Sequence, residues 1–349
     1  MAVFKDDKGR WGFSVRYIDA FGKRKQKKSV NKEWTKKQAK IEEEKFLNIV
    51  TSSAITVNDL REIYMQSCSV KLKENTIYQK EIFYNTYIES YFGKMRIDKV
   101  DERTVELWQI EIKKKNLKTS TLNIILGELM AMLHFAYRRR FIVRPIIAEK
   151  FKNDTPIENT SKTISKEQFD LICEEAMKIN KTFYLLLQVL YYTGMRVGEA
   201  LALTNKDIEN NSISISKTYA VRIQKISSTK TNKARKVVIS NRLLDLINEQ
   251  IVYYRNCGIQ KDLYIFGGIS PISYNTIQYE YKKICDKLNI TPTNIHSLRH
   301  THVSNLIALG FNVFEISHRT GHSVEMINKT YGHVMKNPQS DMAEKLENL

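Results

Sequence analysis

Four short stretches between residues 192 and 333 carry side chains that could act together on one phosphodiester. Paired arginines can hold the non-bridging oxygens of a phosphate through directional hydrogen bonds, and histidines can donate to the same oxygens or move a proton. A lysine can protonate a leaving alkoxide, and a tyrosine can be the nucleophile. These cations would stabilise the extra charge of a pentavalent transition state without a metal ion. In chain order the stretches contain Arg196, Lys230, His296 with Arg299, and His322 with Tyr331.

The surroundings of these residues favour positions where the side chains can meet. An apolar helix is expected to end at Gly194, which leaves Arg196 in the turn before the next helix, with Glu199 three residues on to brace its guanidinium. A cation at a helix start is electrostatically unfavourable, which counts against an ordinary surface role for Arg196. His296 and Arg299 are three residues apart and therefore share one face of a helix.

The lysine and the tyrosine are less distinctive on their own. Lys230 is expected at or near a β-turn between strands over residues 213–218 and 236–239, and a lysine in such a turn is usually solvated. Tyr331 is one of 18 tyrosines, and only its distance of nine residues from His322 singles it out.

A different spacing in the same region has to be weighed as a metal site. His296 and His300 are four residues apart, as in a zinc-binding helix. Arg299, rather than a glutamate, lies between them, and a cation inside the ligand shell of a divalent metal is unfavourable. We therefore expect no metal ligands here.

Taken together, the four stretches resemble the tyrosine recombinase (phage integrase) family. The resemblance rests on the order arginine, lysine, His-x-x-Arg, histidine and tyrosine, which is far more specific than any one motif. The segments that carry it read T-G-M-R-V-G-E-A-L-A-L-T at 193–204, H-S-L-R-H-T at 296–301, T-G-H-S at 320–323 and T-Y-G-H at 330–333. Ser297 and Thr320 stand where the family often has an acidic and an apolar residue, neither of which supplies catalytic chemistry.

The resemblance implies a covalent mechanism. Tyr331 would attack the scissile phosphate, giving a 3′-phosphotyrosyl link and a free 5′-hydroxyl, while Arg196 and Arg299 hold the phosphate. The link retains the bond energy, so neither ATP nor a metal is needed and no cofactor is implied. The 5′-hydroxyl of a partner strand then attacks the phosphotyrosine, and two rounds of exchange pass through a Holliday junction in a homotetramer on two DNA sites.

The remaining implied roles concern protons and phosphate oxygens. Lys230 would be the general acid for the 5′-oxygen; Lys233 competes for this role, but Lys230 fits the hairpin position of the family better. His296 would assist as base or phosphate contact, and His322 would donate to the phosphate. The implied partners are double-stranded DNA attachment sites, with an excisionase and a host DNA-bending protein left open.

The first of the elements around this site is a small basic unit over residues 1–50. Apolar and polar residues alternate along 11–18, a second strand is expected over 23–30, and Thr35 can cap a helix, so we expect a sheet on one helix. This unit resembles the arm-binding domain of integrases of temperate phages and related elements. Its basic run either contacts DNA or keeps a strand edge soluble, and it comprises Lys23, Arg24, Lys25, Lys27 and Lys28.

Residues 54–143 resemble the core-binding helical domain of the family. Four helices are expected, the second containing both Ile82 and Ile88, and the fourth capped by Thr119 or Ser120. The fourth helix ends in three arginines that either grip phosphates or are favourable charges at a helix C-terminus: Arg138, Arg139 and Arg140.

The rest of the chain supplies a linker and a third domain. Residues 144–163 have a linker composition, and the capping box from Ser165 to Gln168 begins the catalytic domain, 164–349, which is expected to be mainly helical with a small β-sheet. A tail from Met342 either docks on a neighbouring protomer or is a frayed terminus. The fold class is therefore multidomain α+β.

Composition bounds the class of protein. The 349 residues include 56 Lys and Arg against 38 Asp and Glu, a formal net charge of +18 that favours a polyanionic partner. Residues 1–50 are densest in charge, with 14 basic and 7 acidic residues. The longest dense apolar stretch, 183–192, is far short of the ~20 residues that span a bilayer, and the four cysteines form no disulfide framework. We therefore expect neither a membrane nor a secreted protein, but a cytoplasmic one; the resemblance implies a bacterial host cell and association with its nucleoid.

Our leading interpretation is a site-specific recombinase that integrates and excises a phage or similar mobile element. Two alternatives share the resemblance: a type IB topoisomerase, which relaxes DNA without recombination, and a catalytically silent DNA-binding regulator. A metal-dependent nuclease is disfavoured because clustered carboxylates are missing from the sequence.

Overall fold

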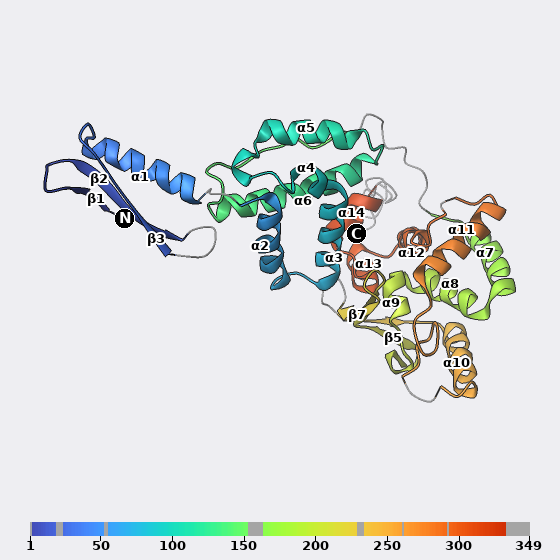
Figure 1. Ribbon diagram of the computed structural model, residues 1–349. Helices are drawn as coiled ribbons and strands as arrows, with labels where there is room; N and C mark the ends of the chain where they lie inside the picture. Colours follow the sequence, from blue (N-terminus) through green and yellow to red (C-terminus); the bar gives the residue numbers. More distant parts are fainter. Residues whose placement is uncertain are drawn as a thin grey trace, which may run out of the picture. The chain divides into compact units, whose positions relative to one another are not determined.

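The computed structural model describes residues 2–18, 24–51, 55–152, 163–228, 234–259, 262–291 and 293–332. The chain divides into two compact units, Met1–Ile157 and Glu158–Leu349 (Figure 1). The expected multidomain α+β class is confirmed, with a small N-terminal sheet and helix, a helical module, and a mainly helical unit that contains small sheets. Outside the described residues lie Lys23, Lys230, Lys233, much of the expected linker, and the tail.

The N-terminal segment is an antiparallel three-stranded sheet, in the order β1-β2-β3, with one helix along it (Figure 1). Phe13 and Val15 are buried with Ala39 of the helix, and Phe13 stacks on Trp34 with ring centroids 6.0 Å apart. The alternation along residues 11–18 thus identified the buried face. The elements are β1 (Ala2–Lys5), β2 (Trp11–Ile18), β3 (Arg24–Asn31) and α1 (Lys36–Thr51).

The register of β2 and β3 divides the basic run between two faces of the sheet. Val15, which is buried against α1, pairs with Lys27, and Lys27 Nζ lies 5.9 Å from the ring centroid of Phe46 on α1. Arg16 and Lys28 are displaced by one position from this pair and therefore lie on the opposite face. The lysines of one short run consequently have different surroundings.

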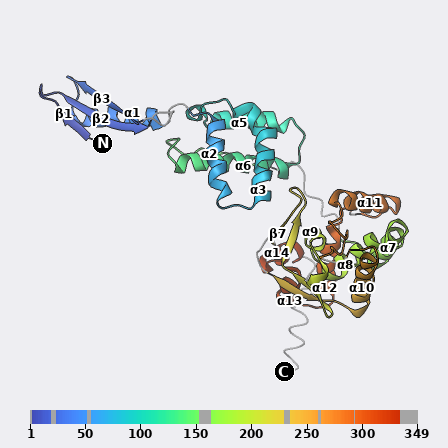
Figure 2. The ribbon, with the colours of Figure 1, turned by 60° about the horizontal axis from the view of Figure 1, so that its bottom comes forward.

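The helices of the second module, α2 to α6, lie together in the ribbon (Figure 2). Their buried side chains, among them Leu60 and Trp108, form one apolar core. The expected inward residues of the last helix are all buried: Leu122, Ile125, Leu126, Leu129 and Leu133. The elements are α2 (Val57–Ser69), α3 (Glu74–Phe83), a π-helical turn η1 (Tyr84–Ile88), α4 (Glu89–Phe92), a short 3-10 helix η2 (Ile97–Lys99), α5 (Glu102–Lys113) and α6 (Thr119–Arg138).

Two details of this module correct the sequence expectations. The second helix runs unbroken over residues 74–92 but is not a regular α-helix throughout, because the π-helical turn η1 between α3 and α4 inserts a residue and shifts the inward face; Ile82 is 39% exposed while Ile88 is fully buried. The N-cap of α6 is Lys118, which makes no side-chain capping bond, so the predicted cap at Thr119 or Ser120 is wrong.

Helix α6 is also relevant to the expectation of no membrane. Among the described residues it is the single helix long and apolar enough to cross a bilayer by length and composition. Its buried residues form the core of the helical module, which accounts for its apolar composition. The helix ends at Arg138, and the exposed Arg139 lies 5.6 Å from the Phe135 ring centroid.

The C-terminal unit combines helices with two small sheets, β4-β5-β8 and β6-β7. The strand expected over 213–218 is two strands in different sheets, interrupted at residue 216. The capping box at Ser165 and the end of α8 at Gly194 are as predicted, and Gly194 is in the left-handed region. The elements are α7 (Lys166–Ile179), α8 (Lys181–Thr193), α9 (Val197–Leu201), η3 (Asn205–Asp207), β4 (Ile208–Glu209), β5 (Ser212–Ile215), β6 (Lys217–Ala220), β7 (Lys225–Ser228), β8 (Arg235–Val238), α10 (Asn241–Asn256), α11 (Tyr274–Lys287), α12 (Ser297–Ala308), α13 (Val313–Thr320) and α14 (Val324–Tyr331).

A buried ion pair ties α9 to β8 in this unit. Glu199 is 1% exposed and accepts from Arg235 Nη2 at 2.6 Å and Nη1 at 3.1 Å. Arg196 Nη1 donates to the same carboxylate at 3.0 Å. Burial would raise the pKa of Glu199, but hydrogen bonds and charge from Arg235 and Arg196 outweigh it, and the pKa is lowered. Glu199 is therefore a shared counter-ion for two arginines.

We predict that Glu199→Gln destabilises the protein by about 3–5 kcal/mol, because it leaves a buried arginine without its counter-charge. The measurement is urea unfolding of the full chain. Glu209→Gln is the matched control: it breaks an ion pair with Lys236 whose side chains are 71% and 56% exposed, and should cost about 0–1 kcal/mol. Equal losses in the two variants would contradict this account of the buried pair.

Candidate active site

The most buried charge among the candidates is the guanidinium of Arg299. The residue is 2% exposed and sits in the first turn of α12. Its Nη1 donates to the Gly194 carbonyl at 2.7 Å, its Nη2 to the Thr320 carbonyl at 2.9 Å, and its Nε to His322 Nε2 at 3.1 Å. All three acceptors are uncharged groups, so these bonds fix the arginine without neutralising it.

Two helix ends supply the carbonyl acceptors. Gly194 caps α8 and Gly321 caps α13, both in the left-handed region, with φ of 63° and 70°. Helix C-termini carry partial negative charge, which favours a cation at this point. At Gly194 a side chain would be strained and would also collide with His302, because an added Cβ would lie 2.4 Å from its Cδ2. The Thr-Gly sequence at each helix end thus supplies two of the three hydrogen-bond acceptors of Arg299.

The electrostatic consequence is a preformed site for an anion. Burial, followed by the charge of Arg196, lowers the pKa of Arg299 to about 9. The guanidinium nevertheless stays charged at neutral pH. A buried cation without a bonded carboxylate is costly, and an anionic ligand would offset that cost. A phosphate would do so through directional, charge-assisted hydrogen bonds.

His322 is held in a defined neutral form by its neighbours. Thr320 Oγ1 donates to the Ile316 carbonyl, so it accepts from His322 Nδ1 at 3.1 Å, and Nε2 accepts from Arg299. Burial, followed by the charges of Arg299 and Arg196, lowers the pKa of His322 to about 3. In the DNA-free protein, therefore, Nε2 is an acceptor and holds no proton to donate.

Arg196 lies at the start of α9, where Glu199 holds both its backbone N–H, at 2.9 Å, and its side chain. The expected bracing contact is thus present. The side chain keeps 26% exposure. Its charge lowers the pKa values of His296, Arg299 and His322, so these groups share one electrostatic environment.

Tyr331, the last residue of α14, has its hydroxyl inside the unit rather than at its surface. It is 5% exposed, and burial raises its pKa to about 12 against an opposing effect of Arg299. Its Oη lies 2.6 Å from His300 Nδ1. The His300 ring in turn meets the His296 ring edge-on, with centroids 5.3 Å apart. Burial, followed by the charge of His300, lowers the pKa of His296 to about 4.

The structure therefore brings five of the six sequence-predicted catalytic residues into one region of the C-terminal unit: Arg196, His296, Arg299, His322 and Tyr331. Lys230 lies outside the described residues, two positions after β7 ends at Ser228. The described members of the DNA-contact set are exposed and belong to the N-terminal unit: Arg24, Lys25, Lys27, Lys28, Arg138, Arg139 and Arg140.

Sequence reasoning missed three residues that complete the site. Arg235 alternates with Lys236 along β8 and shares the inward side of Val237, so strand period alone could have flagged a buried cation. His300 was considered only as a metal ligand, although it contacts Tyr331. Thr320 was assigned no chemistry, yet its carbonyl holds Arg299 and its hydroxyl holds His322.

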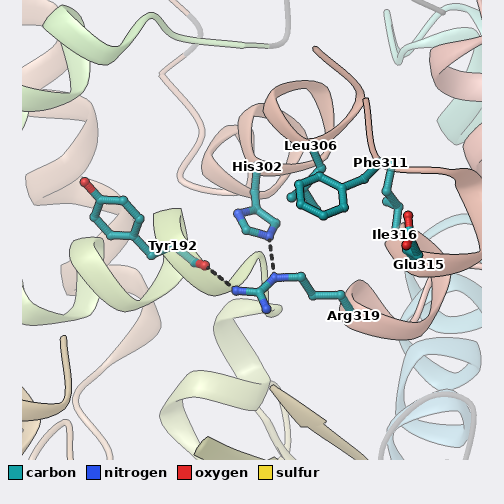
Figure 3. Close-up of a pocket in the computed structure, with 7 residues that line it drawn as sticks. All are labelled: Tyr192, His302, Leu306, Phe311, Glu315, Ile316 and Arg319. Atoms are coloured by element: carbon teal, nitrogen blue, oxygen red, sulfur yellow. Dashed lines mark hydrogen bonds between the residues drawn. The ribbon is translucent and has the colours of Figure 1, made fainter. Parts of the chain in front are cut away.

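Arg319 joins the last turn of α8 to His302 on α12 (Figure 3). Its Nε donates to His302 Nε2 at 3.2 Å and its Nη2 to the Tyr192 carbonyl at 3.0 Å. His302 Nδ1 faces the Tyr191 carbonyl at 2.8 Å and so carries the proton, and burial lowers its pKa to about 4. A cavity of about 400 Å³ opens beside this pair, and none of the five described candidate residues lines it.

Comparison with protein families gives two matches. The Phage integrase family matches residues 162–337, which contain the site, and the N-terminal SAM-like domain of phage integrases matches residues 56–112, in the helical module. These segments fall on the two regions whose motifs and helices suggested the resemblance.

Individual proteins similar to this chain are also integrases. The ICEBs1 integrase of Bacillus subtilis is 30% identical over 320 residues, covering 85% of this chain and 84% of the relative. The integrase of Staphylococcus phage L54a is 29% identical over 180 residues, covering 47% of this chain and 51% of the relative.

Solved structures share the fold. The Tn1549 transposon integrase in complex with a circular intermediate DNA has a TM-score of 0.69 at 20% identity, covering 85% of this chain and all of that one. A lambda integrase dimer bound to a core site has a TM-score of 0.64 at 12% identity, covering 94% and 93%. With the family match over half of the chain and the full-length relative, these findings show that the protein belongs to the phage integrase family and is a tyrosine site-specific recombinase of the kind found in integrative mobile elements.

Proposed function

We propose that Tyr331 is the nucleophile of this recombinase and that the scissile phosphate binds against Arg299 and Arg196. The observation that carries the proposal is the buried Arg299 guanidinium, held only by uncharged acceptors in its described hydrogen bonds, in the same electrostatic environment as Tyr331. Oη would form a bond to phosphorus and the bond to the 5′-oxygen would break, leaving a 3′-phosphotyrosyl link. Attack by a partner 5′-hydroxyl reverses these changes and joins the new strand, through a Holliday junction.

The other groups act on charge and protons in this proposal. Lys230 protonates the departing 5′-oxygen, and His296 contacts the phosphate. His322 donates to a phosphate oxygen after the ring gains a proton; the negative phosphate supports this step because it offsets the arginine charges that hold the pKa of His322 low. None of these steps requires a cofactor.

We propose a separate function for each domain of the chain. Residues 164–349 are catalytic, residues 54–143 bind the core site, residues 1–50 bind arm-type DNA, and residues 144–163 link the domains. Two of the solved structures contain DNA, a circular intermediate in one and a core site in the other, which supports double-stranded attachment sites as the substrate. The working form would be a tetramer on DNA in a bacterial cell, with an excisionase and a host DNA-bending protein as further partners.

The sheet geometry sharpens the arm-DNA proposal. The face away from α1 carries Arg16, Arg24, Gln26 and Lys28 in register, whereas Lys27 lies toward α1 and over Phe46. A basic sheet face can enter a groove and neutralise phosphates. Arg16, which stands outside the sharpest basic run, joins the candidate contacts on this geometry.

Tyr331→Phe is the direct test of the nucleophile. On a nicked suicide substrate the wild-type protein should accumulate a covalent protein–DNA adduct, and the variant, lacking the hydroxyl, should form none while still binding DNA. Tyr253→Phe, at a 59% exposed position of α10, is the matched control and should form adduct at the wild-type rate. Persisting adduct in Tyr331→Phe would show that another residue attacks.

A pair of double variants tests the sheet face. Arg16→Gln with Lys28→Gln should reduce the salt slope of arm-DNA binding by about 2, since each lost phosphate contact contributes about 0.9. Lys25→Gln with Lys27→Gln removes the same charge from the α1 side and should change the slope less. Both should leave cleavage of a substrate with only the core site intact; equal slopes in the two variants would contradict the assignment of faces.

A further inference from the structure

The hydroxyl of Tyr331 meets a histidine that the roles above do not use. Oη lies 2.6 Å from His300 Nδ1, and the ring centroids are 5.9 Å apart. His300 comes from the first turn of α12 and Tyr331 from the last turn of α14, so the contact joins two different helices. The distance is within the reach expected of a general base and the proton that it removes.

Attack on phosphorus requires the tyrosine to lose its proton. Burial raises the pKa of Tyr331 to about 12, so the phenol keeps its proton at neutral pH and needs an acceptor beside it. An imidazole nitrogen with a free lone pair is a suitable acceptor near neutral pH. His300 Nδ1 is at hydrogen-bonding distance from the oxygen that would attack.

The neighbouring described histidines are placed for other contacts. His322 directs Nε2 at Arg299 and Nδ1 at Thr320. The His296 ring meets the His300 ring edge-on. Both His296 and Tyr331 are described, and no hydrogen bond joins them. The base role that the family resemblance offered to His296 therefore fits His300 better on geometry.

We propose that His300 is the general base for Tyr331, an inference that rests on the proposed role of Tyr331 as nucleophile. As the bond from Oη to phosphorus forms, the phenolic proton passes to Nδ1 and leaves a histidinium. The bond to the 5′-oxygen breaks, and that oxygen takes a proton from the proposed general acid, Lys230. When a 5′-hydroxyl later attacks the phosphotyrosine, the histidinium returns its proton to Oη as the tyrosine departs.

The test compares His300→Asn with the wild-type protein in single-turnover cleavage of a nicked suicide substrate across pH. The amide keeps a polar group near the Nδ1 position but cannot take up a proton. We expect a loss of about 10²–10⁴-fold at neutral pH, the usual contribution of a general base. The residual rate should rise about tenfold per pH unit as hydroxide removes the proton, whereas the wild-type rate, with a base beside the phenol, should depend less steeply on pH.

A substrate with sulfur in place of the bridging 5′-oxygen separates the two proton transfers. Sulfur leaves without protonation, so this substrate should rescue Lys230→Ala, whose defect concerns the leaving group. It should not rescue His300→Asn, whose defect concerns the nucleophile. His318→Asn, an exposed position on α13, is the matched control and should cleave both substrates like the wild type.

His300→Ala provides a second, independent measurement. Imidazole added to the buffer should restore part of its cleavage rate, since a free base can enter the vacated space; this readout survives if His300→Asn fails to fold. Wild-type rates in His300→Asn, or slow cleavage with the wild-type pH profile and no rescue by imidazole, would overturn the base role. Failure of the nucleophile assignment itself is seen separately, as adduct formed by Tyr331→Phe.

Discussion

The C-terminal unit is organised around one buried positive charge that its own hydrogen bonds do not neutralise. Removing a guanidinium from water costs several kcal/mol after relaxation, and Arg299 meets that cost with two carbonyls at helix C-termini and one imidazole. The left-handed glycines that end α8 and α13 are what allow both carbonyls to face the same point. The ends of α8 and α13, and the position of α12 between them, are thus constrained by the hydrogen bonds of a single side chain.

A neighbouring carboxylate shows why that charge persists. Glu199 is buried close by, but its oxygens are committed to Arg235 and Arg196. Two arginines therefore use the one nearby acid while Arg299 is bonded to none, and the region keeps a net positive charge that matches a phosphodiester. The same net positive charge disfavours further cations, and it contributes to the lowered pKa values of the nearby histidines.

Sequence order was sufficient to identify most of the site, because the motifs fall at helix ends whose signals are local. Gly194 ends a helix, Ser165 begins one, and His296 and Arg299 share a turn, so each of these could be placed from spacing. The partners of Arg235 and His300 could not, since they are 36 and 31 residues away in sequence and depend on how β8 and α14 pack; strand period marks only that Arg235 faces inward. The π-helical turn was missed for a similar reason: the inserted residue leaves the composition helical, and only the exposure of Ile82 beside the burial of Ile88 reveals the shift.

The protonation states of the DNA-free site follow from its charge, and they differ from those that the proposed roles need. With burial and the arginines holding the pKa values of His296 and His322 near 4 and 3, both rings are neutral at physiological pH, and His322 Nε2 is occupied by Arg299. A phosphate that accepts from Arg299 competes directly with that imidazole, and its negative charge raises the pKa of every nearby histidine. The ligand that the arginines attract is thus the same ligand that would release His322 and favour its protonated form. On this view a single anion both fills the site and sets the protonation states of its histidines. The DNA-free arrangement would then be a resting state whose electrostatics change when a DNA strand binds.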